Sequence, residues 1–241
     1  MKLWIAAFVL SLSAPAWGTC EVRNFAVAVD TGHSPQEPGS TSARGKSEFE
    51  FNDRLARELH KALQEAGYGQ SFLLNPYRKE LSLHERTKLA DGRSADLFLS
   101  IHHDSVQPHY LSSWKYKDQT LKYADQFSGF SLWVSGSSRG SAAALLTAKA
   151  IGSAMLSRGL TPTQHHAEPI PGESRTVLDA RRGIYRRDGL AVLRTSKAPA
   201  VLIEAGVIVN RAEEALLELP GHRAKIVRAI IEGVGAACRG G

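Results

Sequence analysis

The stretch LFLSIHHDS, residues 97–105, decides the fold, because an apolar run ends there on two histidines and an aspartate. A short apolar run of this kind is typical of a strand buried on both faces, as in a parallel sheet. The histidine pair at its end is either a chance feature or part of a metal site. The rest of the sequence must decide between these two interpretations.

Comparable apolar runs occur on both sides of this strand in the sequence. We expect further strands at residues 25–30, 72–74, 130–134, 191–194 and 200–205. Helical spacing predicts helices from the Ser47 cap to about Gly67, and at residues 81–89, 141–156 and 221–237. Strands that alternate with helices indicate an α/β fold: one domain with a mostly parallel, twisted sheet flanked by helices.

Two stretches show no clear period. Residues 106–128 are polar and aromatic, and we interpret them as an insertion. Residues 160–190 carry prolines, glycines and arginines, which predicts a long functional loop.

Composition and charge limit the class of protein. The chain has 241 residues, of which 43% are hydrophobic, and this fits one domain with a sizeable core. A net charge of +6 favours an anionic partner such as nucleic acid, a membrane surface or a wall polymer. The sequence lacks the basic, aromatic-interleaved stripe of a nucleic-acid binder, so we expect no nucleic-acid partner.

The N-terminus has the pattern of an export signal. Lys2 precedes an apolar run at 3–14, and the small-residue exit SAPAWG follows at 13–18. Residues 1–18 are therefore a predicted signal peptide, cleaved near Gly18. The run is too short to span a bilayer comfortably, so we expect an exported, periplasmic chain of residues 19–241 without stable membrane insertion.

The two cysteines, Cys20 and Cys238, lie near the two ends of the expected mature chain. Domain termini often lie close together, and an oxidising compartment favours a bond between such cysteines. A disulfide is the favoured interpretation, with two free thiols as the alternative. Thr19 is too bulky for the residue that usually precedes a lipidated cysteine.

Several chemically capable side chains follow predicted strands. His33, His102 and Glu204 each stand at or just after the end of an apolar run, and Glu48 begins the first helix. In open α/β sheets, ligands bind at the carboxyl ends of the strands. Two histidines and one carboxylate are a common catalytic Zn²⁺ ligand set, and a further carboxylate is needed for proton transfer. Glu204 is the candidate for that task.

Four motifs resemble those of the zinc-dependent N-acetylmuramoyl-L-alanine amidases of bacterial cell walls: VDTGH (29–33), SEFEFN (47–52), SADLFLSIHHDS (94–105) and PAVLIEAGVIVN (199–210). The resemblance implies that His33, Glu48 and His102 bind Zn²⁺ and that Glu204 is the catalytic carboxylate. It also implies a substrate, peptidoglycan or muropeptides, and cleavage of the amide between N-acetylmuramic acid and L-alanine.

The sequence departs from the family pattern at four positions: Thr31 for Pro, Ser34 for Gly, His103 for a small residue and Val207 for Phe. His103 would compete for the metal if it faced the site. Alternation along a strand places His102 and His103 on opposite faces, and the motif position favours His102 as the ligand.

Structural explanations compete with these functional ones. Glu48 could complement the dipole of its helix, and Glu204 could form a salt bridge. Asn52 and Asn210 are expected to be structural or to orient the site. Arg86 is expected to make a structural pairing, because its HERTK segment lacks the second histidine of a HExxH helix.

Two further clusters could have a function. The HHAE cluster (His165, His166, Glu168) could bind metal, but nearby prolines favour a solvated loop, with substrate contact as a weaker alternative. The second cluster is basic and consists of Arg181, Arg182, Arg186 and Arg187. It either binds the carboxylates of wall peptides or forms a solvated basic face.

Other functions stay open at this point. A zinc peptidase that cuts within the wall peptide would use the same ligands. A non-catalytic peptidoglycan-binding protein would keep the fold, although it would be free to lose Glu204. We expect a monomer, and a protein activator is conceivable if one of the two long stretches covers the site.

Overall fold

The computed structural model describes residues 20–240, so the predicted signal peptide lies outside the described residues. A seven-stranded sheet forms the centre of the domain, in the order β2-β1-β3-β9-β6-β8-β7. The strands are β1 (Val27–Thr31), β2 (Phe72–Leu73), β3 (Leu97–Asp104), β6 (Ser131–Val134), β7 (Thr176–Asp179), β8 (Ile184–Arg186) and β9 (Ala200–Val207). Strands β2, β1, β3 and β9 are mutually parallel, β6 is antiparallel to β9, and β7 is antiparallel to β8. The predicted mostly parallel sheet is confirmed.

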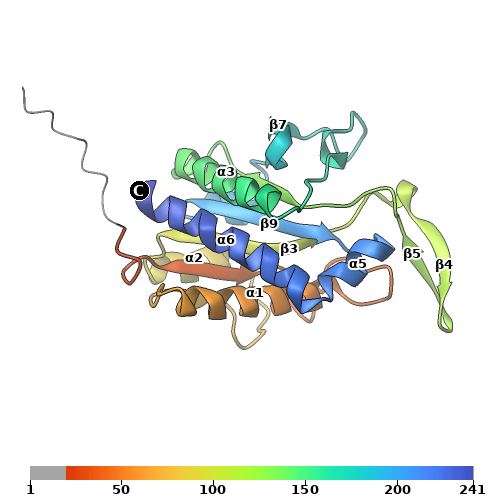
Figure 1. Cartoon of the computed structure of the whole chain (residues 1–241), viewed down its shortest axis with the longest axis horizontal. Helices are drawn as coiled ribbons and strands as arrows, with labels where there is room; N and C mark the ends of the chain where they lie inside the picture. Colours follow the sequence, from red (N-terminus) through yellow and green to blue (C-terminus); the bar gives the residue numbers. More distant parts are fainter. Residues whose placement is uncertain (1–19, 241) are drawn as a thin grey trace, which may run out of the picture.

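Helices cover both faces of the sheet. Helices α1 (Glu48–Glu65), α3 (Ser141–Ser157) and α6 (Pro220–Gly240) pack together on one face, where Figure 1 shows them side by side. Helices α2 (Leu83–Gly92) and α4 (Ala191–Thr195) pack against each other on the opposite side. The short helix α5 (Arg211–Leu217) follows β9. Within residues 20–240, no helix has both the length and the apolar character needed to cross a membrane.

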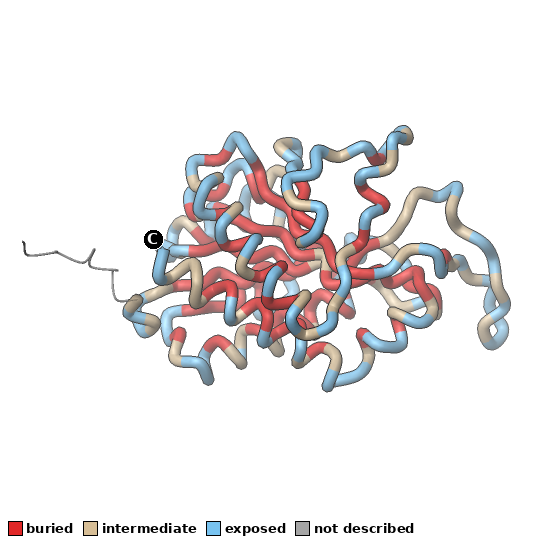
Figure 2. The backbone as a smooth tube through the Cα atoms, turned by 45° about the horizontal axis from the view of Figure 1, so that its top comes forward, coloured by how far each residue is buried: buried red, intermediate tan, exposed pale blue. Residues whose placement is uncertain are grey.

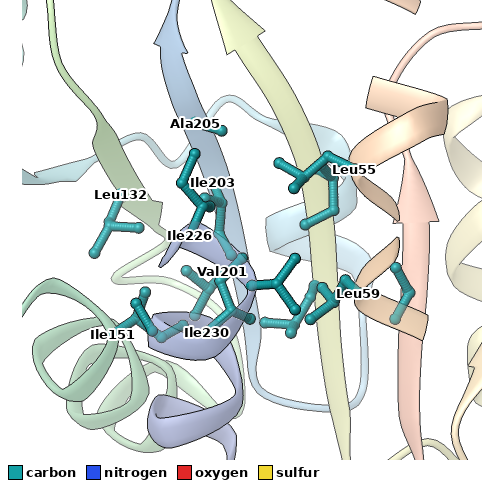
Figure 3. Packing of buried hydrophobic residues seen from close by; sticks show 14 of the residues in the cluster. Leu55, Leu59, Leu132, Ile151, Val201, Ile203, Ala205, Ile226 and Ile230 are labelled. Atoms are coloured by element: carbon teal, nitrogen blue, oxygen red, sulfur yellow. The ribbon is translucent and has the colours of Figure 1, made fainter. Parts of the chain in front are cut away.

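The core follows from strand alternation. Val201 and Ile203 of β9 point to the α1/α3/α6 face, while Leu202 joins the α2/α4 face. Figure 3 shows Ile151 of α3 and Ile230 of α6 closing on the first set. Burial is concentrated in the central strands, as the red segments of Figure 2 show. Strands β1, β3 and β9 are therefore almost entirely buried.

Local signals position the helix ends. The Glu50 carboxylate accepts a hydrogen bond from the Ser47 backbone N–H at 3.2 Å, so the predicted cap of α1 is confirmed. Asn210 caps α5, because its Oδ1 accepts from the N–H groups of Ala212 and Glu213. Of the two roles expected for Asn210, structural or orienting the site, the structure shows the structural one.

One predicted strand is wrong. Residues 191–194 form the short helix α4, not a strand. An apolar run of four residues has no period that separates the two. Val192 and Leu193 are buried in either case, here against the α2 side of the sheet.

The two stretches without a clear period contain regular structure. Residues 106–128 include the hairpin β4 (Ser112–Tyr116) and β5 (Gln119–Tyr123), which projects away from the sheet at the right of Figure 1. Trp114 anchors it by donating a hydrogen bond to the Ala43 carbonyl at 2.8 Å. Residues 160–190 include β7 and β8, which complete the sheet.

The disulfide prediction is confirmed. Cys20 and Cys238 are bonded, and both cysteines of the sequence are used. The bond joins the start of the described chain to the end of α6.

Candidate active site

The carboxyl ends of β1, β3 and β9 bring the predicted residues together. His102 on β3 lies opposite Glu204 on β9, and the chain after β1 leads into His33. The structure groups His33, Glu48 and His102, each with one ligand atom within 4.8 Å of the others. His33 Nε2 lies 3.1 Å from Glu48 Oε2, and His102 Nδ1 lies 3.0 Å from Glu48 Oε1. Each oxygen of one carboxylate thus faces one imidazole nitrogen.

The loop between β1 and α1 carries His33 and makes hydrogen bonds with the first turn of α1. The backbone N–H of Glu48 donates to the Ser40 carbonyl at 2.8 Å, and the Ser40 N–H donates to Glu48 Oε2 at 3.2 Å. Farther along the loop, Ser42 Oγ donates to the Glu214 carboxylate at 2.7 Å. The first turn of α1 is therefore fixed to the loop that precedes it.

Arg86 fixes the backbone around His33 through hydrogen bonds from its guanidinium group. Its guanidinium donates to Asp30 Oδ1 at 2.9 Å, to the His33 carbonyl at 2.6 Å and to the Thr31 carbonyl. Arg86 and Asp30 are both buried. His33 has a φ of 67°, a left-handed conformation that a non-glycine residue keeps only when its surroundings enforce it. The pairing expected for Arg86 thus exists, and it supports a site residue.

Two glycines allow the three side chains to approach. A Cβ on Gly32 would lie 2.4 Å from the His102 ring. A Cβ on Gly39 would lie 2.6 Å from Glu48 Oε2, and Gly39 has a φ of +76°. Both positions need glycine, the first for space and the second also for its backbone conformation.

Asn52 links the group to the neighbouring histidine. Its Nδ2 donates to Glu48 Oε1 at 3.1 Å and to the Gly32 carbonyl at 3.2 Å. Its Oδ1 accepts from His103 Nδ1 at 2.8 Å. His103 packs against Phe51, and burial lowers its pKa to about 3, so it is neutral. His103 stays outside the His33–Glu48–His102 group.

Charge is concentrated in this group. Burial alone would raise the pKa of Glu48, but hydrogen bonds from His102 and His33 outweigh it and hold the pKa well below its ordinary value. For His33, burial opposes the charged form, yet the Glu48 carboxylate raises the pKa above its ordinary value. Glu48 is therefore ionised and able to act as an anionic ligand.

Glu204 differs sharply from Glu48. Its Oε2 is buried and has no hydrogen-bond partner within residues 20–240. Burial raises the pKa of Glu204 well above its ordinary value, and the negative charges of Asp104 and Glu48 add to the effect. Two carboxylates with opposite pKa shifts at one site are a common sign of acid–base chemistry.

Two cavities meet the group. One of about 290 Å³ is lined by Glu48, Glu204, Arg175 and Arg187, among others. Another of about 770 Å³ flanks His33 and His102 on the α2 side and carries more apolar lining. The smaller cavity is the one that both carboxylates line.

The four predicted arginines separate in the structure. Arg182 pairs with Asp179 at 2.6 Å, and Arg186 pairs with Asp188 at 2.6 Å. Arg181 is exposed, and Arg187 lines the cavity with Glu204. The arginine pattern did not indicate which of the four would reach the site. Arg175, also in the lining, was missed because it carries no sequence signal beyond its charge.

The HHAE cluster is not a solvated loop, so that prediction is wrong. His165 and His166 are buried, and they form a second group of metal-capable side chains with Asp104. Glu168 lies apart from this group and accepts a hydrogen bond from the Tyr110 hydroxyl. The nearby prolines are compatible with burial, because a proline-rich segment can also pack against a domain.

Fold and site together define an α/β domain with a candidate metal centre at the carboxyl edge of its sheet. Residues 27–236 match the model of the Amidase_3 family, described as N-acetylmuramoyl-L-alanine amidase, and the chain belongs to this family. The family is generally metal-dependent.

Known proteins agree with this placement. The chain is 27% identical over 236 residues to N-acetylmuramoyl-L-alanine amidase AmiC of Neisseria meningitidis serogroup B, covering 88% of this chain and 52% of AmiC. It is 26% identical over 219 residues to AmiA of Escherichia coli K12, covering 86% of this chain and 74% of AmiA. The chain thus spans about half of AmiC and three quarters of AmiA.

A solved structure shows the same fold. The N-acetylmuramyl-L-alanine amidase Ami1 of Mycobacterium smegmatis superposes with a TM-score of 0.70 at 19% identity, covering 91% of this chain and 99% of that one.

Proposed function

We propose that this chain is a zinc-dependent hydrolase that cleaves the amide between N-acetylmuramic acid and L-alanine in peptidoglycan. The observation that carries the proposal is the position of Glu204. Glu204 lines the same cavity as Glu48, whose carboxylate lies between His33 and His102, and its buried Oε2 has no hydrogen-bond partner within residues 20–240. Family membership supplies the substrate class.

The donor set fits zinc. Two imidazole nitrogens and one carboxylate are the ligands of many catalytic Zn²⁺ sites, and these three gather within 4.8 Å. Gly32 and Gly39 leave just enough room for the ligands, and Asn52 orients the carboxylate. When bound, the ion would supply Lewis acidity, which favours attack of water on an amide carbonyl.

The protein's own residues would move the proton. Glu204 would accept the proton of the attacking water and return it to the leaving nitrogen of L-alanine. A carboxyl whose pKa is raised by burial is suited to hold a proton between these two steps. Arg187, on the same cavity, would bind a carboxylate of the wall peptide.

The N-terminal pattern supports a proposal for the compartment. We infer export to the periplasm, since residues 1–18 read as a signal peptide and the substrate lies outside the cytoplasmic membrane. The Cys20–Cys238 disulfide supports an oxidising compartment. A protein activator and a monomeric state stay predictions.

The test is the mass of the products. The full chain, produced with export and purified, is loaded with zinc and incubated with intact peptidoglycan and, separately, with soluble muropeptides. We expect free peptides that begin with L-alanine and glycan strands that keep their lactyl groups. A parallel sample with Glu204→Gln identifies activity from contaminants.

Two other outcomes would replace the proposal. Shortened peptides still attached to muramic acid would show a zinc peptidase on the same scaffold. Binding to peptidoglycan without products from either substrate would show a non-catalytic wall-binding protein.

A further inference from the structure

A second group of metal-capable side chains lies at the end of β3. Asp104, His165 and His166 each place one ligand atom within 4.8 Å of the others. His165 and His166 come from the turn at His165–Ala167, about 60 residues further along the chain than Asp104. The domain therefore brings two distant segments together to assemble the group.

The second group repeats the pattern of the first. Asp104 Oδ2 lies 2.7 Å from His166 Nε2 and 3.6 Å from His165 Nε2. One carboxylate again faces two imidazole nitrogens, as Glu48 faces His33 and His102. In each group the three ligand atoms lie within 4.8 Å of one another.

An orphaned atom points into the second group. His165 Nε2 has no hydrogen-bond partner within the described residues, and the side chain has 0% of its surface exposed. His165 Nδ1 lies 2.7 Å from Thr163 Oγ1, and in the tautomer in which Nδ1 donates to this hydroxyl the Nε2 lone pair faces Asp104. A buried polar atom without a partner destabilises the folded state. A cation at this point would satisfy it.

Outer partners fix the other ligands. His166 Nδ1 donates to Glu173 Oε2 at 2.9 Å, so Nε2 is the ring nitrogen that faces Asp104 Oδ2, and an ion would replace the 2.7 Å contact between these two atoms. The Ser105 N–H donates to Asp104 Oδ1 at 2.8 Å, so Oδ2 is the carboxylate oxygen that faces the two histidines. Histidine ligands usually donate their second ring nitrogen to a carboxylate or other acceptor in this way.

The backbone also directs Asp104 into the group. The register of β3 on β9 shifts after His102, so that Asp104 pairs with Val207. Bulges of this kind redirect side chains beside active sites. The group has an entry path as well, because Asp104, His166 and Glu173 line the 290 Å³ cavity that also holds Glu204.

We propose that Asp104, His165 and His166 form a second binding site for a divalent metal ion of the zinc type, separate from the site of His33, Glu48 and His102. Two imidazoles and one carboxylate favour zinc over magnesium or calcium, which prefer all-oxygen ligands. The competing explanation is a purely structural network in which a protonated His166 lies between Asp104 and Glu173.

Metal stoichiometry tests the proposal. The full chain is saturated with zinc, freed of excess ion by gel filtration and measured by mass spectrometry of the metal. We expect about two zinc ions per chain in the wild type and about one in His165→Gln, His166→Gln or Asp104→Asn. His102→Ala should also hold about one. His84→Gln, an exposed histidine on α2, is the matched control and should keep two.

A thermal measurement avoids reliance on variants of the second group. The His102→Ala variant keeps only that group intact, so added zinc should still raise its Tm, because an ion that binds the folded state stabilises it. An unchanged Tm, or a wild type with one zinc that His166→Gln retains, would overturn the second site.

The same data separate this proposal from the proposed function. A single ion lost in His102→Ala but kept in His166→Gln would overturn the second site and leave the amidase proposal intact. A single ion lost in His166→Gln but kept in His102→Ala would support the second group and remove the ligand set on which the amidase proposal rests.

Discussion

At the scale of single residues, hydrogen-bond partners decide what each buried carboxylate can do. Glu48 and Glu204 line one cavity, yet hydrogen bonds from two histidines stabilise the charge of Glu48, while Glu204 Oε2 has no partner among the described residues. Identical side chains thus have opposite pKa shifts. The first is suited to bind a cation and the second to carry a proton.

Glu204→Gln tests this division of roles. The amide keeps the size of the side chain but cannot accept and return a proton, so kcat/KM should fall by roughly 10²–10⁴-fold. Zinc content should stay at the wild-type value. Glu50→Gln, which alters an exposed helix cap, is the control. Near-normal turnover by Glu204→Gln would remove Glu204 from the reaction.

Candidate site residues could be predicted from the sequence where each stands at or just after the end of an apolar run that indicates a buried strand. His33, His102 and Glu204 stand at or just after the ends of buried runs, and the carboxyl ends of parallel strands meet at one edge. Asp104 was visible in the same run, but its partners His165 and His166 come from a long segment whose path depends on tertiary packing. Glu173 had no local signal.

At the scale of elements, β8 positions the one arginine of its cluster that reaches the cavity. The backbone N–H of Arg187 donates to the Val134 carbonyl at 3.0 Å, which extends the pairing of β8 with β6. The Arg187 guanidinium lies 5.7 Å from the centre of the Trp133 ring. Arg187 is thereby held beside Glu204 at the cavity.

Arg187→Ala should weaken binding of an anionic wall peptide. We expect KM to rise by about 10-fold with kcat nearly unchanged, because an ion pair formed equally in ground and transition states affects KM alone. Arg181→Ala, on the exposed turn before β8, is the matched control. An equal effect of the two substitutions would indicate a general basic surface. Steady-state kinetics on a soluble muropeptide measures both constants.

The α5 segment carries a titrating group of its own. Burial raises the pKa of Glu213 to about 7, against hydrogen bonds from the backbone N–H groups of Val207 and Gly129. Between the ordinary pKa of 4.5 and 7, the folded state binds more protons than the unfolded chain. The contribution of Glu213 to stability therefore falls as pH rises through this window.

Glu213→Gln should remove that dependence, because the amide resembles the protonated acid. The stability of the variant relative to the wild type should rise from pH 5 to pH 8 by up to about 3 kcal/mol. Chemical denaturation at several pH values measures it. Glu65→Gln, at an exposed position of α1, controls for the lost charge. A difference that does not vary with pH would contradict the assignment.

Helices and strands could be predicted from the sequence when they were long enough for the spacing of their apolar residues to show a helical or strand period. The Ser47–Glu50 cap and the apolar spacing of α1 predicted its position closely. The run at 191–194 is too short to show whether it is helix or strand, and burial of Val192 and Leu193 is compatible with both. The hairpin β4–β5 was missed because both strands lie mostly exposed.

At the scale of the whole molecule, one covalent bond joins the two ends of the domain. Cys20 and Cys238 are 218 residues apart in sequence, so the disulfide closes nearly the whole described chain into a loop. Such a bond stabilises the fold mainly by restricting the unfolded chain.

The double variant Cys20→Ser/Cys238→Ser should lose about 2–5 kcal/mol of unfolding free energy. A reducing agent should lower the Tm of the wild type to that of the variant and leave the variant unchanged. Equal Tm values for oxidised wild type and variant would show that the bond does not contribute to stability.

The same bond determines how the domain responds to mechanical tension. When the chain is pulled at its two ends, the load passes from Cys20 directly to Cys238 through the sulfur atoms, and the sheet between them carries none of it. The segment between the two cysteines cannot be extended while the disulfide is intact. In the reduced chain the same segment, once unfolded, could extend to roughly 700 Å. Tension on the two ends of the described chain therefore leaves the geometry of the candidate site unchanged while the disulfide is intact.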